Sequence, residues 1–212
     1  MTHWIRIINR FFTLGLILAG CINPLIPVER HRGFFPVSVW YAGGKARAPM
    51  LETVTPKKAL YWKQDLQQIK DLGFNTVRCW VEWANCEKQE GNYDFTALET
   101  LAFLADQVGI KLFIQVYIDS APEWVGKKYP DGKFVASNGL AVESQASPGY
   151  CFDHPGVRDK ILQFFSEAAK VVKDMPALYG WDLWSEPHII NWAEVYHLGD
   201  TRYLQFCYCS HT

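Results

Sequence analysis

Residues 73–78 read Gly-Phe-Asn-Thr-Val-Arg, and residues 109–114 read Gly-Ile-Lys-Leu-Phe-Ile. In both stretches a glycine follows a helical pattern, and one or two residues then lead into a hydrophobic strand. Glycine is favoured just after the last helical residue because it adopts the left-handed conformation without steric cost. The repeated order of helix stop, short loop and strand predicts that the chain is built from β/α units.

The same pattern extends to both sides of these stretches. The helix that ends before Gly73 carries Trp62, Leu66, Ile69 and Leu72 at helical spacing, which predicts that all four face the core. Apolar strands that alternate with amphipathic helices predict a parallel sheet covered by helices. Strands are expected at residues 35–41, 75–81, 111–118 and 179–184, helices at residues 57–72, 95–108 and 155–172, and an irregular stretch at residues 119–154.

Two architectures fit this order, a doubly wound sheet and a (β/α)8 barrel. A doubly wound nucleotide-binding protein usually carries a glycine-rich phosphate loop after its first strand. Residues 41–45, Tyr-Ala-Gly-Gly-Lys, match neither common phosphate-binding motif. The sequence therefore favours an α/β fold of the (β/α)8 TIM-barrel type. A complete barrel takes about 250 residues, so we expect the 212-residue chain to be truncated to about the first four β/α units.

The composition is that of a globular protein, and its charge balance argues against some classes of binding partner. The chain is 49% hydrophobic and 20% charged, with a formal net charge of -1. This balance gives no electrostatic reason to expect binding to nucleic acid or to an anionic membrane surface. Nine Trp, ten Tyr and thirteen Phe either fill a core or supply flat apolar surfaces on which sugar rings stack.

The first 20 residues have the pattern of a secretory signal. A short basic region precedes the apolar residues 11–20, which are too few to span a bilayer because a spanning helix needs about 20. Residues 18–21, Leu-Ala-Gly-Cys, resemble the bacterial lipobox, in which the cysteine is acylated and becomes the mature N-terminus. An ordinary signal peptide is the alternative.

The lipobox resemblance implies how the chain is divided into segments and where in the cell the protein is located. Residues 1–20 are expected to be a lipoprotein-type signal peptide, residues 21–33 a tether, and residues 34–212 the N-terminal half of the barrel. The protein is expected to be exported to a bacterial cell envelope, in the periplasm or at the outer membrane. Its only expected membrane contact is a lipid anchor on Cys21.

Five further cysteines do not form an even set that disulfides could pair completely. Cys207 and Cys209 are separated by one residue, a spacing that is poor for zinc, and the sequence holds no Cys-x-x-Cys partner for them. We therefore expect no metal site and interpret these cysteines as structural or free thiols. They are Cys79, Cys86, Cys151, Cys207 and Cys209.

Polar and aromatic residues gather at the carboxyl ends of the expected strands, which is where TIM-barrel enzymes place their active sites. Carboxylates, aromatic rings and polar donors together are what a sugar hydrolase requires. The residues with a possible role in substrate binding are Arg47, Trp80, Glu82, Tyr117, Asp119, Trp124, Trp184, Ser185 and His188, and those with a possible role in catalysis are Arg78 and Glu186.

Four stretches in a fixed order carry a more specific signal. They are residues 62–78, which end in Gly-Phe-Asn-Thr-Val-Arg, residues 83–95, which end in Glu-Gly-Asn-Tyr-Asp-Phe, residues 121–124, Ala-Pro-Glu-Trp, and residues 180–187, which end in Glu-Pro. Together they resemble the N-terminal half of a clan A retaining glycoside hydrolase, closest to family 42, the β-galactosidase-like family. The resemblance covers roughly residues 35–195.

The resemblance implies roles for two residues. Glu186 takes the place of the general acid/base, which protonates the departing glycosidic oxygen and later deprotonates the incoming water. Arg78 takes the place of the arginine that orients the nucleophile. From the residues alone, Glu186 followed by Pro187 also fits the start of a helix, and Arg78 also fits a structural ion pair.

The chain departs from the family pattern in two respects. Ser185 stands where clan A enzymes carry the Asn that holds the sugar 2-hydroxyl. The second carboxylate of a retaining mechanism, about 5–5.5 Å from the first, comes from strand seven in this clan and is not expected in this chain. We therefore expect the chain by itself to be inactive.

The full-length enzyme is expected to hydrolyse a terminal β-glycosidic bond of an oligo- or polysaccharide, with β-galactosidase-like specificity and with no cofactor. Two alternatives stay open at this point. One is a clan A hydrolase of another specificity, such as a β-mannanase, β-glucosidase or galactanase, which Ser185 favours. The other is a non-catalytic glycan-binding surface lipoprotein.

Overall fold

The computed structural model describes residues 33–44, 50–136, 138–142, 149–183 and 207–212. All the helices and strands that it describes belong to the compact unit Pro36–Thr212, which is distinct from residues 1–35. None of the described helices is both long and apolar enough to cross a membrane. The expected signal peptide, Cys21 and all but the last residue of the expected tether lie outside the described residues.

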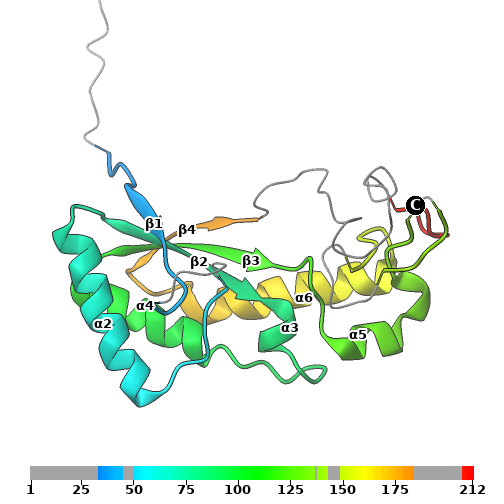
Figure 1. Ribbon diagram of the computed structural model, residues 1–212, viewed down its shortest axis with the longest axis horizontal. Coiled ribbons are helices and arrows are strands. Elements are labelled where there is room, and N and C mark those ends of the chain that lie inside the picture. Colours follow the sequence, from blue (N-terminus) through cyan, green and yellow to red (C-terminus); the bar gives the residue numbers. More distant parts are fainter. Residues whose placement is uncertain (1–32, 45–49, 137, 143–148, 184–206) are drawn as a thin grey trace, which may run out of the picture. The chain divides into compact units, whose positions relative to one another are not determined.

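Four parallel strands form one sheet, and their order in the sheet is their order along the chain (Figure 1). A doubly wound sheet reverses its strand order at a switch point, so the sequential order agrees with a barrel. The helices between successive strands lie along one face of the sheet in Figure 1. The elements are β1 (Ser38–Trp40), α2 (Pro56–Asp71), β2 (Thr76–Glu82), α4 (Thr96–Val108), β3 (Lys111–Tyr117), α6 (Pro155–Val172) and β4 (Leu178–Asp182).

Local sequence signals set the ends of the helices. Thr55 caps the start of α2, because its hydroxyl accepts a hydrogen bond from the N–H of Lys58 at 3.3 Å, and Pro56 follows in the first turn. Gly73 and Gly109 follow the ends of α2 and α4 with φ values of 94° and 74°. These values lie in the left-handed region that favours glycine, so the predicted glycine stops are confirmed.

The core lies between the helices and one face of the sheet. Alternate residues of β2 and β3 are buried there, because successive side chains of a strand point to opposite faces. The buried strand residues are Val77, Cys79, Val81, Leu112, Ile114 and Val116, and the helices contribute Trp62, Leu66, Leu101, Ala105, Phe164 and Ala168 to the same cluster.

The predicted inner face of α2 is correct except at its end. Trp62 and Leu66 are fully buried and Ile69 packs against the core, but the side chain of Leu72 is 77% exposed. The helix ends at Asp71, and Leu72 is its capping residue. The prediction for Leu72 is wrong because the residue lies beyond the last packed turn.

Three short elements were not expected from the sequence. They are α3 (Trp83–Cys86), α5 (Glu123–Lys128) and η1 (Pro130–Gly132), of which α5 and η1 lie in the stretch that was expected to be irregular. Each is too short for an apolar repeat to reveal it. The longer elements lie where the sequence predicts them, and the largest difference is at β1, which covers residues 38–40 instead of 35–41.

Candidate active site

The face of the sheet away from the helices carries partly exposed side chains. Arg78, Trp80 and Glu82 of β2 alternate with the buried residues of that strand. The strand register places Phe113 beside Arg78 and Tyr117 beside Glu82. Glu82 and Tyr117 are the last residues of β2 and β3, so they mark the carboxyl edge of the sheet. We call this surface the open face, and it consists of Trp40, Arg78, Trp80, Glu82, Phe113, Tyr117 and Asp182.

Arg78 connects β1, β2 and β4 on the open face. Its Nη2 donates to Oδ2 of Asp182, and its Cζ lies 4.0 Å from the centroid of the Trp40 ring. The side chains of Arg78 and Asp182 are 29% and 17% exposed, so the ion pair is partly shielded from water. The guanidinium is therefore held between a carboxylate and an aromatic face.

Asp182 was not among the site residues that the sequence predicts, because its strand was expected to run to residue 184. In the structure, Asp182 is the last residue of β4, and its partner in the register is Gln115 of β3. Asp182 therefore lies at a strand end, which is where TIM-barrel enzymes place site residues.

Trp80 is enclosed by two other aromatic residues. Its ring stacks on that of Tyr117, with a centroid distance of 4.9 Å and an interplanar angle of 6°. The ring of Trp40 meets it edge-on at 5.5 Å. Because Tyr117 covers one face of Trp80, a sugar ring cannot stack on that face.

A cleft of about 500 Å³ lies beside the end of β2. Oε2 of Glu82 accepts a hydrogen bond there from Nδ2 of Asn85. Burial raises the pKa of Glu82, and hydrogen bonds from Ser120 and Asn85 oppose this effect only in part. A cleft carboxyl with a raised pKa suits proton transfer or the binding of neutral hydroxyl groups. The cleft is lined by Glu82, Ala84, Asn85, Lys88, Ser120, Pro122 and Glu123.

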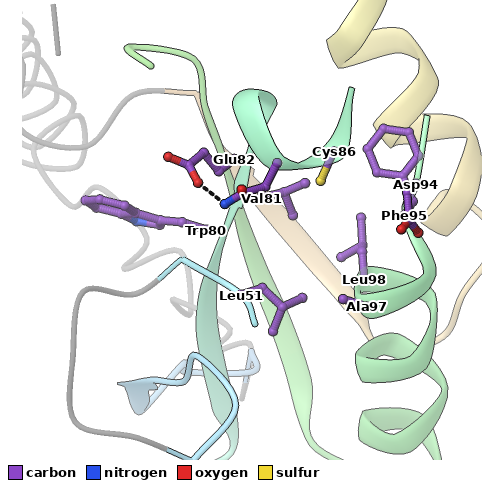
Figure 2. Close-up of a pocket in the computed structure, with 10 residues that line it drawn as sticks. Leu51, Trp80, Val81, Glu82, Cys86, Asp94, Phe95, Ala97 and Leu98 are labelled. Carbon is purple, nitrogen blue, oxygen red and sulfur yellow. Dashed lines mark hydrogen bonds between the residues drawn. The ribbon is translucent and has the colours of Figure 1, made fainter. Parts of the chain in front are cut away.

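A second, much smaller cavity lies on the core side of β2. Figure 2 shows Trp80 and Glu82 directed to one side of the strand, and Cys86, Phe95 and Leu98 on the other side. The volume of this cavity is about 20 Å³, which suits a single water molecule and not a sugar. Substrate-sized space near β2 is therefore on the side of the Glu82 cleft.

A buried carboxylate fixes the loop that follows β2. Glu87 is 1% exposed, and its carboxylate accepts hydrogen bonds from Nε1 of Trp83 at 2.7 Å and from the N–H of Gly91 at 2.8 Å. The carbonyl oxygen of Glu87 accepts a hydrogen bond from Nε1 of Trp124 at 2.9 Å. The indole N–H of Trp124, a predicted substrate-binding residue, is thus used within the protein. Glu87 was not among the site residues that the sequence predicts.

The remaining predicted site residues are placed only in part. Asp119 lies just beyond the end of β3, and its carbonyl oxygen accepts a hydrogen bond from the N–H of Gly149 at 3.1 Å. Five predicted site residues lie outside the described residues. They are Arg47, Trp184, Ser185, Glu186 and His188.

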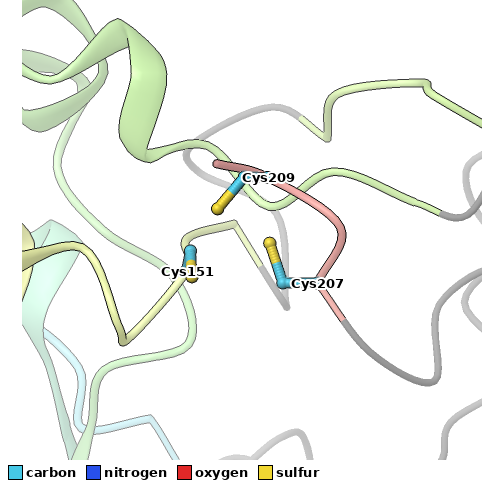
Figure 3. Close-up of side chains that lie close together, drawn as sticks. All are labelled: Cys151, Cys207 and Cys209. Atoms are coloured by element: carbon cyan, nitrogen blue, oxygen red, sulfur yellow. The ribbon is translucent and has the colours of Figure 1, made fainter. Parts of the chain in front are cut away.

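Three thiols meet where residues 207–212 contact an earlier loop. None of the five described cysteines forms a disulfide, and the sulfur atoms of Cys151, Cys207 and Cys209 lie within 4.8 Å of one another (Figure 3). The prediction missed this cluster because Cys151 is distant in sequence. A closed structural zinc site takes four ligands, and no fourth ligand-type side chain joins these three in the described part of the chain.

Asp131, His154 and His211 form a second group nearby. Nδ1 of His154 accepts the N–H of Val157 at 3.2 Å, which caps the start of α6. The neutral ring therefore carries its proton on Nε2, which lies 3.5 Å from Oδ1 of Asp131. A protonated Nε2 donates a hydrogen bond and cannot bind a metal, so the group is better described as a hydrogen-bonded cluster.

Comparison with known proteins decides the family. The model of glycoside hydrolase family 42, described as beta-galactosidase, matches residues 56–206, which is more than half of the chain. The chain belongs to glycoside hydrolase family 42.

Relatives of this family-42 chain include beta-galactosidase LacZ of Heyndrickxia coagulans, which is 27% identical over 149 residues, 70% of this chain and 20% of LacZ. The exo-beta-D-glucosaminidase of Pyrococcus horikoshii is 26% identical over 129 residues, 54% of this chain and 17% of that protein. The chain thus spans about a fifth of the length of the curated relatives it matches.

Solved structures confirm the fold. A beta-galactosidase from the haloarchaeon Halorubrum lacusprofundi superposes with a TM-score of 0.59 at 21% identity, over 72% of this chain and 21% of that one. A beta-galactosidase from Bacillus circulans sp. alkalophilus gives a TM-score of 0.57 at 22% identity, over 74% of this chain and 21% of that one. In its described part, the family-42 chain therefore contains four consecutive strands of a TIM barrel and the helices that connect them, in agreement with the predicted truncated barrel.

The TIM-barrel fold shows which side of the barrel the open face corresponds to. Strand residues that point away from the helices of a TIM barrel face the barrel interior, and catalytic groups lie at the carboxyl ends of the strands. In this family-42 chain, Arg78 and Asp182 lie on the face of the sheet that corresponds to the barrel interior, and Glu82 and Tyr117 lie at the carboxyl ends of β2 and β3.

Proposed function

We propose that the full-length family-42 protein hydrolyses terminal β-galactosidic bonds with retention of configuration, and that this chain supplies the acid/base half of the active site. The match of the family model to residues 56–206 carries the proposal, because it extends over Glu186 and over β2, β3 and β4 of the open face. The names of the relatives support the choice of sugar.

Glu186 acts as the general acid in the first step and as the general base in the second. Trp184, two residues earlier, shields the carboxyl from water and keeps it protonated near neutral pH. Arg78 orients the nucleophilic carboxylate that a later strand supplies. Asp182 and Trp40 fix the guanidinium of Arg78, which supports this role.

The substrate is held by the remaining rim residues. Trp80 and Trp124 are the proposed stacking residues, and Glu82 with its raised pKa is suited to exchange hydrogen bonds with sugar hydroxyls. The further substrate-binding residues that we propose are Arg47, Tyr117, Asp119, Ser185 and His188. The reaction needs carboxylates only, and we propose that it takes place without a cofactor.

The test uses the enzyme encoded by the complete reading frame. Glu186→Gln should lower kcat/KM for an aryl β-galactoside with a poor leaving group by about 10²–10⁴-fold, because the leaving oxygen then departs unprotonated. The loss should be much smaller with an activated aryl leaving group, which needs little protonation. Azide should restore turnover and yield a β-galactosyl azide, because azide attacks without help from a base.

Glu99→Gln is the matched control, because Glu99 is an exposed residue in the first turn of α4. It should retain the activity of the parent enzyme. Equal losses on both classes of leaving group, without azide rescue, would contradict the role of Glu186. Sugar binding without any turnover in the parent protein would favour a glycan-binding protein.

A second specificity is favoured by one observation. Ser185 is shorter than the Asn that holds the 2-hydroxyl in clan A, so the site has room for a different substituent at carbon 2. The relative named exo-beta-D-glucosaminidase agrees with such a change. Comparison of kcat/KM for nitrophenyl β-galactoside, β-glucoside, β-mannoside and β-glucosaminide in the same enzyme decides between these sugars.

We also propose that the protein is exported and anchored to a bacterial envelope through Cys21, with residues 1–20 removed as a signal peptide and the barrel beginning near residue 34. The run Leu-Ala-Gly-Cys at residues 18–21 supports this. Metabolic labelling with palmitate in a bacterial host should label the parent protein and not Cys21→Ser. Labelling of both proteins would contradict acylation at Cys21.

A further inference from the structure

The loop that follows β1 is fastened to helix α2 by the side chain of Tyr41. Tyr41 comes directly after β1 and is buried. Its hydroxyl donates to Oδ2 of Asp65 on α2 at 2.9 Å, and its ring meets that of Trp62 edge-on, with a centroid distance of 6.2 Å. Helix α2 therefore holds the chain at the point where it leaves the sheet.

Two glycines allow the loop to pass close to this hydrogen bond. Gly43 and Gly44 have φ values of 105° and 89°, in the left-handed region that favours glycine. A Cβ atom at Gly44 would lie 2.6 Å from Oδ2 of Asp65, and one at Gly43 would lie 3.1 Å from Nε1 of Trp62. The Gly-Gly pair, which belongs to no phosphate-binding motif, therefore serves the close approach of the loop to α2.

The main chain of the same loop is bonded to β2. The N–H of Tyr41 donates to the carbonyl oxygen of Arg78 at 2.8 Å, and the N–H of Leu51 donates to the carbonyl oxygen of Trp80 at 2.8 Å. Both described ends of the loop therefore lie beside the part of β2 that carries Arg78 and Trp80.

Trp40 and Tyr41 point to opposite sides of the sheet, because successive side chains alternate. Tyr41 belongs to the core cluster, whereas Trp40 belongs to the open face. The Trp40 ring lies 4.0 Å from Cζ of Arg78 and meets the ring of Trp80 edge-on at 5.5 Å. The peptide between Trp40 and Tyr41 thus links α2 to Arg78.

We propose that Asp65 is a positioning residue of the active site, which holds Tyr41 and thereby keeps the ring of Trp40 against the guanidinium of Arg78. The inference rests on the proposed function, in which Arg78 orients the nucleophile. Asp65 belongs to α2, which lies along the other face of the sheet in Figure 1. It therefore acts on the reaction through Tyr41, Trp40 and Arg78, and not by contact with the substrate.

The direction of the hydrogen bond is fixed by the protonation of Tyr41. Burial, and then the hydrogen bond to Asp65, raise the pKa of Tyr41 above its ordinary value. The hydroxyl therefore keeps its proton at neutral pH, and Asp65 is the acceptor. Asp65→Asn keeps an oxygen that can accept, whereas Asp65→Ala has no acceptor and Tyr41→Phe has no donor.

The returning end of the loop has a separate contact with α2. Oε2 of the buried Glu52 lies 2.8 Å from Nζ of Lys58, in the first turn of α2. This ion pair involves neither Tyr41 nor Asp65. Loss of the Asp65 acceptor should therefore release the start of the loop and leave its return to α2 in place.

The test uses the full-length enzyme and aryl β-galactosides. Asp65→Ala and Tyr41→Phe should each lower kcat about tenfold and change KM by less than about twofold, because a small displacement of a catalytic group slows the reaction more than it weakens binding. Asp65→Asn should retain most of the parent kcat. The double variant should lose no more than the more affected single variant, because both changes remove the same hydrogen bond.

The leaving group separates this role from that of Glu186. The loss of kcat/KM in Asp65→Ala should be similar for poor and activated leaving groups, because attack on the sugar is slowed in both cases. Azide should not restore turnover. Glu186→Gln should differ from Asp65→Ala in both respects.

Circular dichroism gives a second readout that needs no activity. The rings of Trp40 and Trp80 are close enough for exciton coupling, and the difference between the spectra of the parent and Trp40→Phe isolates this signal. Asp65→Ala should lose most of it, because the Trp40 ring is then no longer held in one orientation. Urea unfolding gives the folded fraction of each variant, and kcat refers to that fraction.

Asp71→Ala is the matched control on the same helix. Asp71 is exposed, and its carboxylate accepts a hydrogen bond from Gln67 at 2.8 Å. The variant should keep both the parent kcat and the signal of the Trp40 ring.

Three results would overturn the proposal. One is a parent kcat in Asp65→Ala and Tyr41→Phe, and another is an equal loss in Asp65→Asn and Asp65→Ala. The third is an unchanged Trp40 signal in Asp65→Ala, whatever happens to kcat. If the parent protein hydrolyses no β-glycoside, the proposed function fails, and the Trp40 signal alone then decides whether Asp65 positions the ring.

Discussion

Arg78 of β2 joins residues of β1 and β4 on the open face. It pairs with Asp182 and lies over Trp40, and the pair is partly shielded from water. We expect a double-mutant cycle of Arg78→Ala and Asp182→Ala to give a coupling energy of about 1–2 kcal/mol, because either single change leaves the other charge partly desolvated without its partner. Urea unfolding of the parent, the two single variants and the double variant measures this coupling energy.

The exposed pair of Glu123 and Lys127 in α5 is the matched control. Its atoms are 2.6 Å apart, but the side chains are 66% and 73% exposed. A double-mutant cycle of Glu123→Ala and Lys127→Ala should give a coupling energy of less than about 0.5 kcal/mol. Equal coupling in the two pairs would show that burial adds nothing to the pair on the open face.

Glu82 should make the free energy of unfolding fall as the pH rises. A salt-bridged carboxylate, whose pKa is lowered, has the opposite effect. Its pKa is raised in the folded protein, chiefly by burial, so the folded state binds more protons than the unfolded state between the ordinary and the raised pKa. Stability therefore falls as the pH rises through that window. Glu82→Gln keeps an oxygen for Asn85 and should lose this dependence.

Urea unfolding at a series of pH values measures the effect. Below the window the parent protein and Glu82→Gln should be equally stable, and above it the variant should be the more stable of the two. Glu99→Gln, with its exposed side chain, should follow the parent at every pH. Parallel curves for the parent and Glu82→Gln would show that the pKa of Glu82 does not change on folding.

At the scale of an element, Glu87 determines whether α3 and the turn after it keep their shape. Its two carboxylate oxygens accept from two different N–H groups, those of Trp83 and Gly91. Glu87→Gln replaces one oxygen with an NH2 group, which faces a donor and leaves it unpaired in a buried place. We expect a loss of about 2–3 kcal/mol in the free energy of unfolding.

Glu90→Gln is the control for Glu87→Gln in the same loop. The carboxylate of Glu90 is paired with Lys128 and Lys160 at the surface, so its loss should cost less than about 1 kcal/mol. Chemical denaturation of the two variants compares them directly. A loss at Glu87 no larger than that at Glu90 would show that the buried hydrogen bonds of Glu87 do not stabilise the loop.

The long elements could be predicted from the sequence because each carries enough apolar repeats to fix its type. The helix α6 lies where the spacing of its apolar residues places it, and Gly73 and Gly109 end helices as expected. The short helices α3 and α5 could not be predicted, because neither covers two turns. The error at Leu72 has a related cause, since a repeat does not show which turn is the last one packed.

The candidate site could be predicted less completely than the fold. Arg78, Trp80 and Glu82 follow from the rule that strand ends carry the site. Glu87 could not be found by that rule, because it lies in a loop. Asp182 was missed because its strand was expected to run to residue 184, whereas β4 ends at Asp182. The thiol cluster depends on a contact between distant segments, which no local pattern encodes.

At the scale of the whole molecule, the described sheet has two edge strands and an uncovered face. β1 and β4 each pair on one side only among the described strands, and apolar residues near them are exposed, such as Trp40 at 43% and Leu183 at 68%. We expect the 212-residue chain alone to self-associate at micromolar concentration. Light scattering after size-exclusion chromatography measures this, and a monomer at all concentrations would contradict it.

Arg78 and Asp182 are 104 residues apart in the sequence, and this separation has a consequence for folding kinetics. Contacts between distant residues form late, because loop closure costs entropy before the contact can offset it. The ion pair cannot form before β3 and β4 have both joined β2. Its loss should therefore accelerate unfolding and leave the refolding rate almost unchanged. The pair between β2 and β4 lengthens the lifetime of the folded sheet without guiding its formation.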